Sequence, residues 1–331
     1  MTEDFQLENY DFGNSPLGHS VQDAIDALQD GENETGSAVA YGLSDITAEE
    51  LAQFQRVWVQ LDAKTRYMVV EHLTDISESN FELDYRAVGH LALDDEDVEV
   101  RIKAIDLLWT DDSTQLLEKL VHMARWDTAP AVRAKATGDL GRFILLGEYG
   151  DIRPRYSQAA QETAIDIWTN VDEQVDVRRR ALEAISNSSH PIVSEVISEG
   201  YNSHDERMTA SAVYGMGRSC DERWASTVLQ ELSSENPEMR YEAARASGQL
   251  ELETAVPVLA RLALSNERDV QEAAVWSLGE IGGSRAGQAL EKLSEALTDE
   301  DWQPLIEDAI SNANLGHGLP TADNILGFDD V

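Results

Sequence analysis

Hydrophobic and polar residues repeat with the period of a helix along most of the chain. In the stretch "SDITAEELAQFQRVWVQL", Thr47 and Glu50 have the spacing of a capping box. The apolar residues after them recur every three or four positions, at Leu51, Phe54, Val57, Trp58 and Leu61. No segment shows sustained apolar/polar alternation between turn signals, so we expect an all-α protein without a sheet.

One short signature recurs along the chain: an apolar residue, Arg, two variable residues and Ala. Glu206 replaces the apolar residue in one copy. The signature arginines lie 32, 45, 29 and 33 residues apart, at Arg101, Arg133, Arg178, Arg207 and Arg240. Looser copies occur at Arg66, Gln271 and Gln303. A period of this length is typical of stacked helical pairs.

Each signature follows a polar turn and is itself followed by a second helical segment, such as "AVPVLARLAL". Both members of a pair carry apolar residues at helical spacing. A single pair cannot bury both apolar faces, so we expect the array to fold by stacking. The 45-residue interval holds an insertion near residues 144–158, interrupted by Gly147, Gly150 and Pro154. Here we expect an extended connection and a new helix near Ser157.

The ends of the chain lack this regular pattern. We expect residues 1–42 to be a mostly flexible acidic segment, 43–314 to form the repeat solenoid, and 315–331 to be a flexible tail. One short helix is predicted within the first segment, from Val21 to Gln29, after Ser20 as cap. The tail carries Ile325, Leu326 and Phe328 among acidic residues, which leaves a short docking motif as an alternative.

The chain is strongly acidic, with 63 Asp and Glu residues against 25 Lys and Arg and a net charge of −38. This balance resembles the proteins of salt-in halophilic microbes, because dense carboxylates hold water in molar salt while screening weakens their repulsion. We therefore predict that the unfolding temperature rises steeply with KCl; a flat response would contradict a halophilic origin. An acidic disordered protein is disfavoured by the regular apolar pattern.

The single cysteine, Cys220, excludes an internal disulfide and a cysteine-based zinc ribbon. The acidic start "MTEDFQLENYDFG" lacks the basic segment and following apolar segment of a secretory leader. No run of apolar residues reaches the length of a membrane span. We expect a cytoplasmic protein.

The extended pattern apolar-Arg-x-x-Ala-x-x-x-Leu-Gly is best preserved in "DVQEAAVWSLGEIG" and "MRYEAARASGQL". It resembles HEAT repeats, in particular the short HEAT-like repeats of phycocyanobilin-lyase-type proteins, over residues 44–314. The resemblance implies a right-handed α-α superhelix of about 7–8 helical pairs and a scaffold rather than an enzyme. In that family the repeated arginine forms a ladder between repeats, bonding acidic groups and carbonyls. By position the ladder here comprises Arg101, Arg133, Arg178, Arg207 and Arg240.

No phosphate-binding, nucleophile-elbow or zinc-protease motif is present. "YGMGRSC" looks like a phosphate loop, but Gly215 and Gly217 fall where a repeat helix is expected to stop. HEAT-repeat deoxyhypusine hydroxylases carry paired His-Glu dipeptides as iron ligands, and this sequence has no His-Glu. We expect no catalytic residue, metal or cofactor.

Positive charge is concentrated in the five signature helices, which hold 12 of the 25 basic residues against 5 acidic ones. In HEAT-like solenoids one helix of each pair lines the concave side, so we predict a basic stripe there with two exposed aromatic residues. The predicted partner-binding residues are Lys103, Lys135, Arg142, Arg179, Arg180, Arg218, Tyr241, Arg245 and Trp276. The alternative is that these cations only neutralise nearby acidic turns.

The sequence therefore predicts a protein-binding adaptor or regulatory module that holds an anionic segment of a partner on its concave face. One alternative is association with RNA or the ribosome through the same stripe, which molar salt disfavours because counterion release then drives binding weakly. Another is a factor in enzyme or cofactor maturation. The stretch from Asn236 to Gly283, where the signature changes from Arg240 to Gln271, is the first place to look for a partner site.

Overall fold

A computed structural model of the chain describes residues 18–30, 36–299 and 301–315. This part of the chain is all-α, with helices α1 to α18, two short 3-10 helices and no strand. The helices before the insertion are α1 (Val21–Asp30), α2 (Ser37–Gly42), α3 (Ala48–Trp58), α4 (Ala63–Ser79), α5 (Arg86–Ala92), α6 (Val98–Leu107), α7 (Thr114–Trp126) and α8 (Pro130–Tyr149). The others are α9 (Pro154–Thr169), α10 (Val175–Ile185), α11 (Val193–Tyr201), α12 (Glu206–Arg218), α13 (Ala225–Glu231), α14 (Pro237–Gln249), α15 (Val256–Leu262), α16 (Arg268–Ile281), α17 (Gly283–Ala296) and α18 (Trp302–Leu315).

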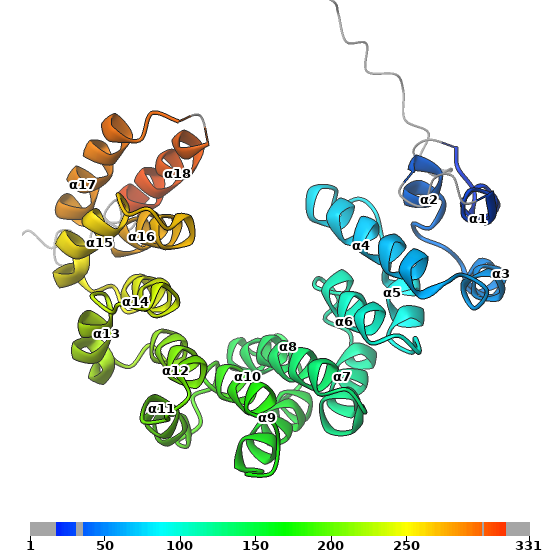
Figure 1. Cartoon of the computed structure of the whole chain (residues 1–331), viewed down its shortest axis with the longest axis horizontal. Coiled ribbons are helices and arrows are strands. Elements are labelled where there is room, and N and C mark those ends of the chain that lie inside the picture. Colours follow the sequence, from blue (N-terminus) through cyan, green and yellow to red (C-terminus); the bar gives the residue numbers. More distant parts are fainter. Residues whose placement is uncertain (1–17, 31–35, 300, 316–331) are drawn as a thin grey trace, which may run out of the picture. The chain divides into compact units, whose positions relative to one another are not determined.

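The chain forms two compact units that divide within α8, between Asp139 and Leu140. In the second unit the helices α10, α12, α14, α16 and α18 pack one on the next and form a row, which we call the signature row. The intervening helices α11, α13, α15 and α17 each pack on the row helix that follows them (Figure 1). The predicted all-α, HEAT-like solenoid is thus confirmed.

Glycines bring the row helices close together. A Cβ atom on Gly217 of α12 would lie 2.7 Å from the Cα atom of Ala246 on α14, and one on Gly248 would lie 2.9 Å from the Cα atom of Ser277 on α16. Helix α12 ends at Arg218, so Gly215 and Gly217 fall in its last turn, where the sequence predicted the end of a repeat helix. The left-handed backbone comes two residues after the helix, at Cys220, with φ 49°.

In the first unit, the local predictions near its start are confirmed. Helix α1 buries Val21, Ala24, Ile25 and Leu28, and it packs on α2 and α3. Thr47 caps α3 through a complete capping box, in which its N–H donates to the Glu50 carboxylate at 2.8 Å. Residues 1–17, 31–35 and 316–331, with the predicted C-terminal docking motif, lie outside the described residues.

The predicted extended connection near residues 144–158 was wrong. Helix α8 continues through Gly147 to Tyr149, and α9 begins at Pro154, where proline suits the first turn. A Cβ atom on Gly147 would lie 2.1 Å from that of Ser157, so glycine here allows α8 and α9 to approach instead of ending a helix.

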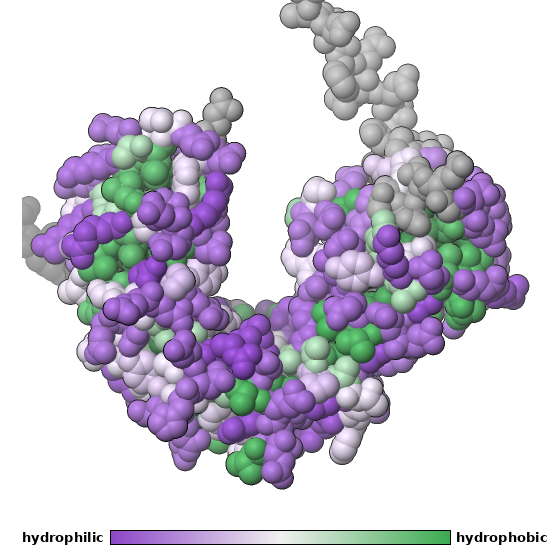
Figure 2. Space-filling model, viewed as in Figure 1, coloured by the Kyte–Doolittle hydropathy of each residue, from purple (hydrophilic) through white to green (hydrophobic). Residues whose placement is uncertain are grey.

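The polar surface agrees with the composition. Hydrophilic residues cover most of each unit on the face that Figure 2 presents. None of the described helices is long and apolar enough to cross a membrane.

Candidate partner-binding face

The ladder arginines connect successive loops. Arg101 on α6 donates to the backbone carbonyl oxygens of Asp95 and Glu96, at 2.8 and 3.1 Å, and pairs side-on with the Asp127 carboxylate through two contacts of 2.9 Å. Its side chain and that of Asp127 are both almost fully buried, at 11% and 10% exposure. The charge-assisted, two-pronged contact fixes one repeat against the next.

Two other arginines make the same kind of contact. Arg240 donates to the carbonyl oxygens of Ser234 and Glu235, at 2.7 and 3.0 Å, and to the Glu267 carboxylate at 3.0 Å. Arg66, outside the predicted set, donates to the Leu61 carbonyl and pairs with Asp95, which also accepts from Trp58. The looser signature copy at Arg66 was therefore a usable signal.

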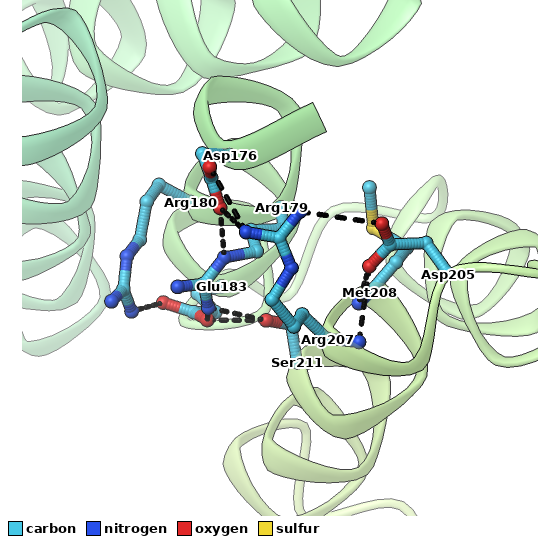
Figure 3. Close-up of polar contacts among 8 residues, drawn as sticks. All are labelled: Asp176, Arg179, Arg180, Glu183, Asp205, Arg207, Met208 and Ser211. Carbon is cyan, nitrogen blue, oxygen red and sulfur yellow. Dashed lines mark hydrogen bonds and ion pairs between the residues drawn. The ribbon is translucent and has the colours of Figure 1, made fainter. Parts of the chain in front are cut away.

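The remaining ladder positions differ. Arg133 donates to the Asp127 carbonyl at 2.9 Å. Arg178 donates to the Trp168 carbonyl at 3.1 Å and lies over the Trp168 ring. Arg207 is half-exposed and reaches back to Asp176 on the preceding row helix, at 2.9 Å, as Figure 3 shows.

Several predicted partner-binding cations are already neutralised within the fold. Arg179 pairs with Asp176 at 3.0 Å and with Glu183 at 3.4 Å, and Arg180 also contacts Glu183 (Figure 3). The Ser211 hydroxyl, from α12, donates to the same Glu183 carboxylate at 2.5 Å.

In the first unit, Lys135 pairs with Asp106 at 2.6 Å and with Asp139 at 3.3 Å. Lys103 is half-buried on α6 and makes no ion pair among the described residues. The guanidinium of Arg142 lies 4.7 Å from the ring centre of Phe143. These three residues belong to α6 and α8, which are not part of the signature row.

Two arginines of the signature row have neutral partners instead. Arg218 donates twice to the side-chain oxygen of Asn187, at 2.8 and 2.6 Å. Arg245 stacks 3.6 Å above the ring centre of Trp276. In the described part of the chain neither guanidinium forms an ion pair with a carboxylate, so no directly bonded carboxylate neutralises its charge.

Charged groups around these arginines belong to one cluster. Burial raises the pKa of the Tyr214 phenol; Arg218 lowers it, and Glu183 and Glu242 raise it again. Burial also raises the pKa of the Glu242 carboxyl to about 7, and the negative charges of Glu183 and Glu238 add to this effect while Arg245 opposes it. We call this cluster the α10–α16 face; it comprises Arg180, Glu183, Tyr214, Arg218, Glu242, Arg245 and Trp276.

The two predicted aromatic residues are half-buried rather than exposed. Trp276 lies beneath Arg245. Tyr241 instead lines a groove of about 640 Å³ between the first turns of α14 and α16, which the sequence did not reveal. The groove falls within the stretch from Asn236 to Gly283. Its lining residues are Pro237, Glu238, Tyr241, Glu267, Arg268, Asp269, Val270 and Glu272.

Across the described residues, no group of three or more His, Cys, Asp or Glu side chains is placed to hold a metal ion. Cys220 is exposed, and its thiol lies 3.9 Å from the Arg218 carbonyl. The arrangement offers binding groups, namely guanidiniums, carboxylates and aromatic rings.

Comparison with known proteins gives a family for part of the chain. The family model for HEAT repeats matches residues 225–314. No curated protein matches the sequence.

Solved structures are similar only at low identity. Escherichia coli YibA is 15% identical, with 82% of this chain and 98% of that one covered and a TM-score of 0.41. Human deoxyhypusine hydroxylase is 16% identical, with coverage of 80% and 95% and a TM-score of 0.34. A structure of Kap95p with RanGDP is 12% identical, with coverage of 88% and 45% and a TM-score of 0.39. The family match over residues 225–314, together with the paired packing of the helices, makes this chain a HEAT-repeat protein.

Proposed function

We propose that this chain is a non-catalytic scaffold or adaptor that binds a partner protein on the α10–α16 face, and that the bound part of the partner is anionic. The HEAT-repeat fold supports a protein-binding scaffold role. The claim that the bound segment is anionic is supported by two arginines of this face that have no carboxylate partner among the described residues.

Arg218 and Arg245 carry the proposal. Carboxylates outnumber cations by 63 to 25 in this chain, so a guanidinium has many chances of a carboxylate partner. Arg179 and Arg180, on α10 of the same row, have taken such partners. Arg218 and Arg245 are instead held by an amide oxygen and an indole ring, which orient each guanidinium without cancelling its charge.

An oriented guanidinium suits a carboxylate or phosphate, because its planar donors match two acceptor oxygens at once. One largely buried carboxyl of the face, that of Glu242, opposes such a ligand only weakly. The pKa of Glu242 is raised to about 7, so near neutral pH this group is protonated about half the time. An incoming anion would raise that pKa further and favour the neutral form.

A protein partner is favoured over nucleic acid at either salt level. At low salt the net charge of −38 repels a polyanion, and at high salt counterion release no longer drives nucleic-acid binding. A short acidic segment of a protein needs only a local basic contact.

Affinity purification in molar KCl, followed by peptide mapping, tests the proposal. The wild-type chain and the Arg218→Gln/Arg245→Gln variant serve as baits, and overlapping peptides of each recovered protein are tested for direct binding. The matched control is Arg261→Gln/Arg285→Gln, which removes two exposed arginines from α15 and α17.

The proposal expects an acidic peptide that binds wild type and the control but not the face variant. It fails if the binding peptide is neutral or basic, or if the face variant retains it. Recovery of ribosomal RNA with the wild-type bait, lost in the face variant, would favour the nucleic-acid alternative instead.

A further inference from the structure

The groove between the first turns of α14 and α16 differs from the α10–α16 face in charge. Pro237, Val270 and the ring of Tyr241 give it apolar and aromatic walls, and carboxylates surround them. We propose that this groove binds an arginine side chain of a partner protein, stacked on Tyr241 and held by Glu238 and Asp269. This is a second contact, of opposite polarity to the anion-binding face.

The groove retains negative charge after its internal pairs are counted. Glu267 pairs with Arg240 at 3.0 Å, and Glu272 pairs with Arg268 at 2.7 Å. Two further lining carboxylates, Glu238 and Asp269, have no cationic partner among the described residues. They lie in the first turns of their helices, where each helix N-terminus contributes about half a positive charge. The two N-termini together offset only about one of the two negative charges.

Tyr241 supplies a surface for a planar cation. Elsewhere the chain places its own arginines over aromatic rings, at Arg142/Phe143, Arg155/Tyr156, Arg178/Trp168, Arg245/Trp276 and Arg268/Trp302. Tyr241 is half-buried and, within the described residues, has no arginine over its ring. The ring therefore offers to a partner the contact that the fold repeatedly makes with itself.

The chemistry favours arginine over lysine. A guanidinium can stack flat on the ring and donate in its own plane to carboxylates on both sides, whereas an ammonium is a strongly hydrated point charge. Screening in molar salt weakens the Coulomb attraction for both cations. The stacking contact survives screening, so the preference for arginine should persist in high salt.

Fluorine NMR on full-length protein labelled with 3-fluorotyrosine tests this inference with a defined probe. The Tyr241 resonance is assigned from its loss in Tyr241→Phe, and the protein is titrated with N-acetyl-arginine amide. Matched titrations use the lysine and citrulline analogues, of which citrulline has the same shape without the charge. The exposed Tyr149 provides an internal reference.

We expect a saturable shift at Tyr241, but not at Tyr149, with arginine binding about five- to tenfold more tightly than lysine and citrulline binding too weakly to saturate. The Glu238→Gln/Asp269→Asn variant should weaken arginine binding about tenfold, because it removes both uncompensated charges. Glu291→Gln/Glu295→Gln, on exposed positions of α17, should leave it unchanged.

The inference is overturned if the Tyr241 resonance does not respond to arginine, or if citrulline moves it equally. It is also overturned if the Glu238→Gln/Asp269→Asn variant binds arginine as wild type does. The Arg218→Gln/Arg245→Gln variant is expected to bind the probe normally, so the groove and the anion-binding face can fail separately.

Discussion

The arginines at the ladder positions and those on the α10–α16 face are chemically identical but have different surroundings. Arg101 and Arg240 lie between loops, where carbonyl oxygens and a carboxylate accept from them. Arg218 and Arg245 lie on the row helices, where an amide and an indole ring hold them. The comparison teaches that the repeated motif places arginines between loops, whereas two arginines of the same helices have no carboxylate partner among the described residues and carry the proposed binding role.

The largest effect is expected from Arg101→Ala. The substitution leaves the nearly buried Asp127 carboxylate without its cation and two carbonyl oxygens without their donor. We expect a loss of about 3–5 kcal/mol in the free energy of unfolding, because removing one partner of a buried pair leaves an uncompensated charge. Urea unfolding followed by circular dichroism in molar KCl measures it.

Arg207→Ala is the matched variant, because Arg207 and its partner Asp176 are about half-exposed. Its cost should be small beside that of Arg101→Ala, because solvent screens an exposed ion pair. Equal losses for Arg101→Ala and Arg207→Ala would remove the distinction between buried ladder arginines and exposed ones.

An intermediate effect is expected from Glu242→Gln, and it should depend on pH. The pKa of Glu242 rises from 4.5 to about 7 on folding, so stability is full below 4.5 and is lost as the pH rises through 7. Glutamine cannot ionise, so the variant should match wild type at about pH 4 and exceed it by roughly 1–3 kcal/mol at about pH 8.

The pH profile of the unfolding midpoint measures this difference, with the exposed Glu291→Gln as control. A gain for Glu242→Gln that is independent of pH would mean that ionisation of this carboxyl does not oppose folding.

The smallest effect on stability is expected from Arg218→Gln/Arg245→Gln. Neither guanidinium neutralises a carboxylate, so the variant loses contacts to Asn187 and Trp276 at a cost of about 1 kcal/mol or less in free energy of unfolding. Thermal unfolding in molar KCl provides the measurement. A loss of unfolding free energy as large as that of Arg101→Ala would mean that these arginines are structural, as the ladder arginines are.

Local signals in the sequence were sufficient for the repeat architecture. The Thr47 capping box and the apolar face of α1 depend on residues three or four positions apart, so the pattern alone predicts them. The signature period correctly located the row helices. Gly217 and Gly248 were harder to interpret, because a glycine that ends a helix and one that lets helices approach look alike in sequence.

The side-chain contacts of the α10–α16 face were only partly predictable from the sequence. The pairs of Arg179 with Asp176 and Glu183 have helical spacing, so this neutralisation could have been inferred. The contacts of Arg218 with Asn187 and of Arg245 with Trp276 each span 31 residues and depend on how neighbouring row helices align. The groove beside Tyr241 arises from two helix starts in adjacent repeats, which no single stretch of sequence contains.

The most direct test of the account is the dissociation constant of the mapped acidic peptide, measured by fluorescence anisotropy in molar KCl. It is compared among wild type, Arg218→Gln/Arg245→Gln and Arg261→Gln/Arg285→Gln. We predict at least about tenfold weaker binding for the face variant, since two charge-assisted contacts are lost, and no change for the control. Equal affinities for all three folded proteins would contradict the assignment of the α10–α16 face as the anion-binding surface.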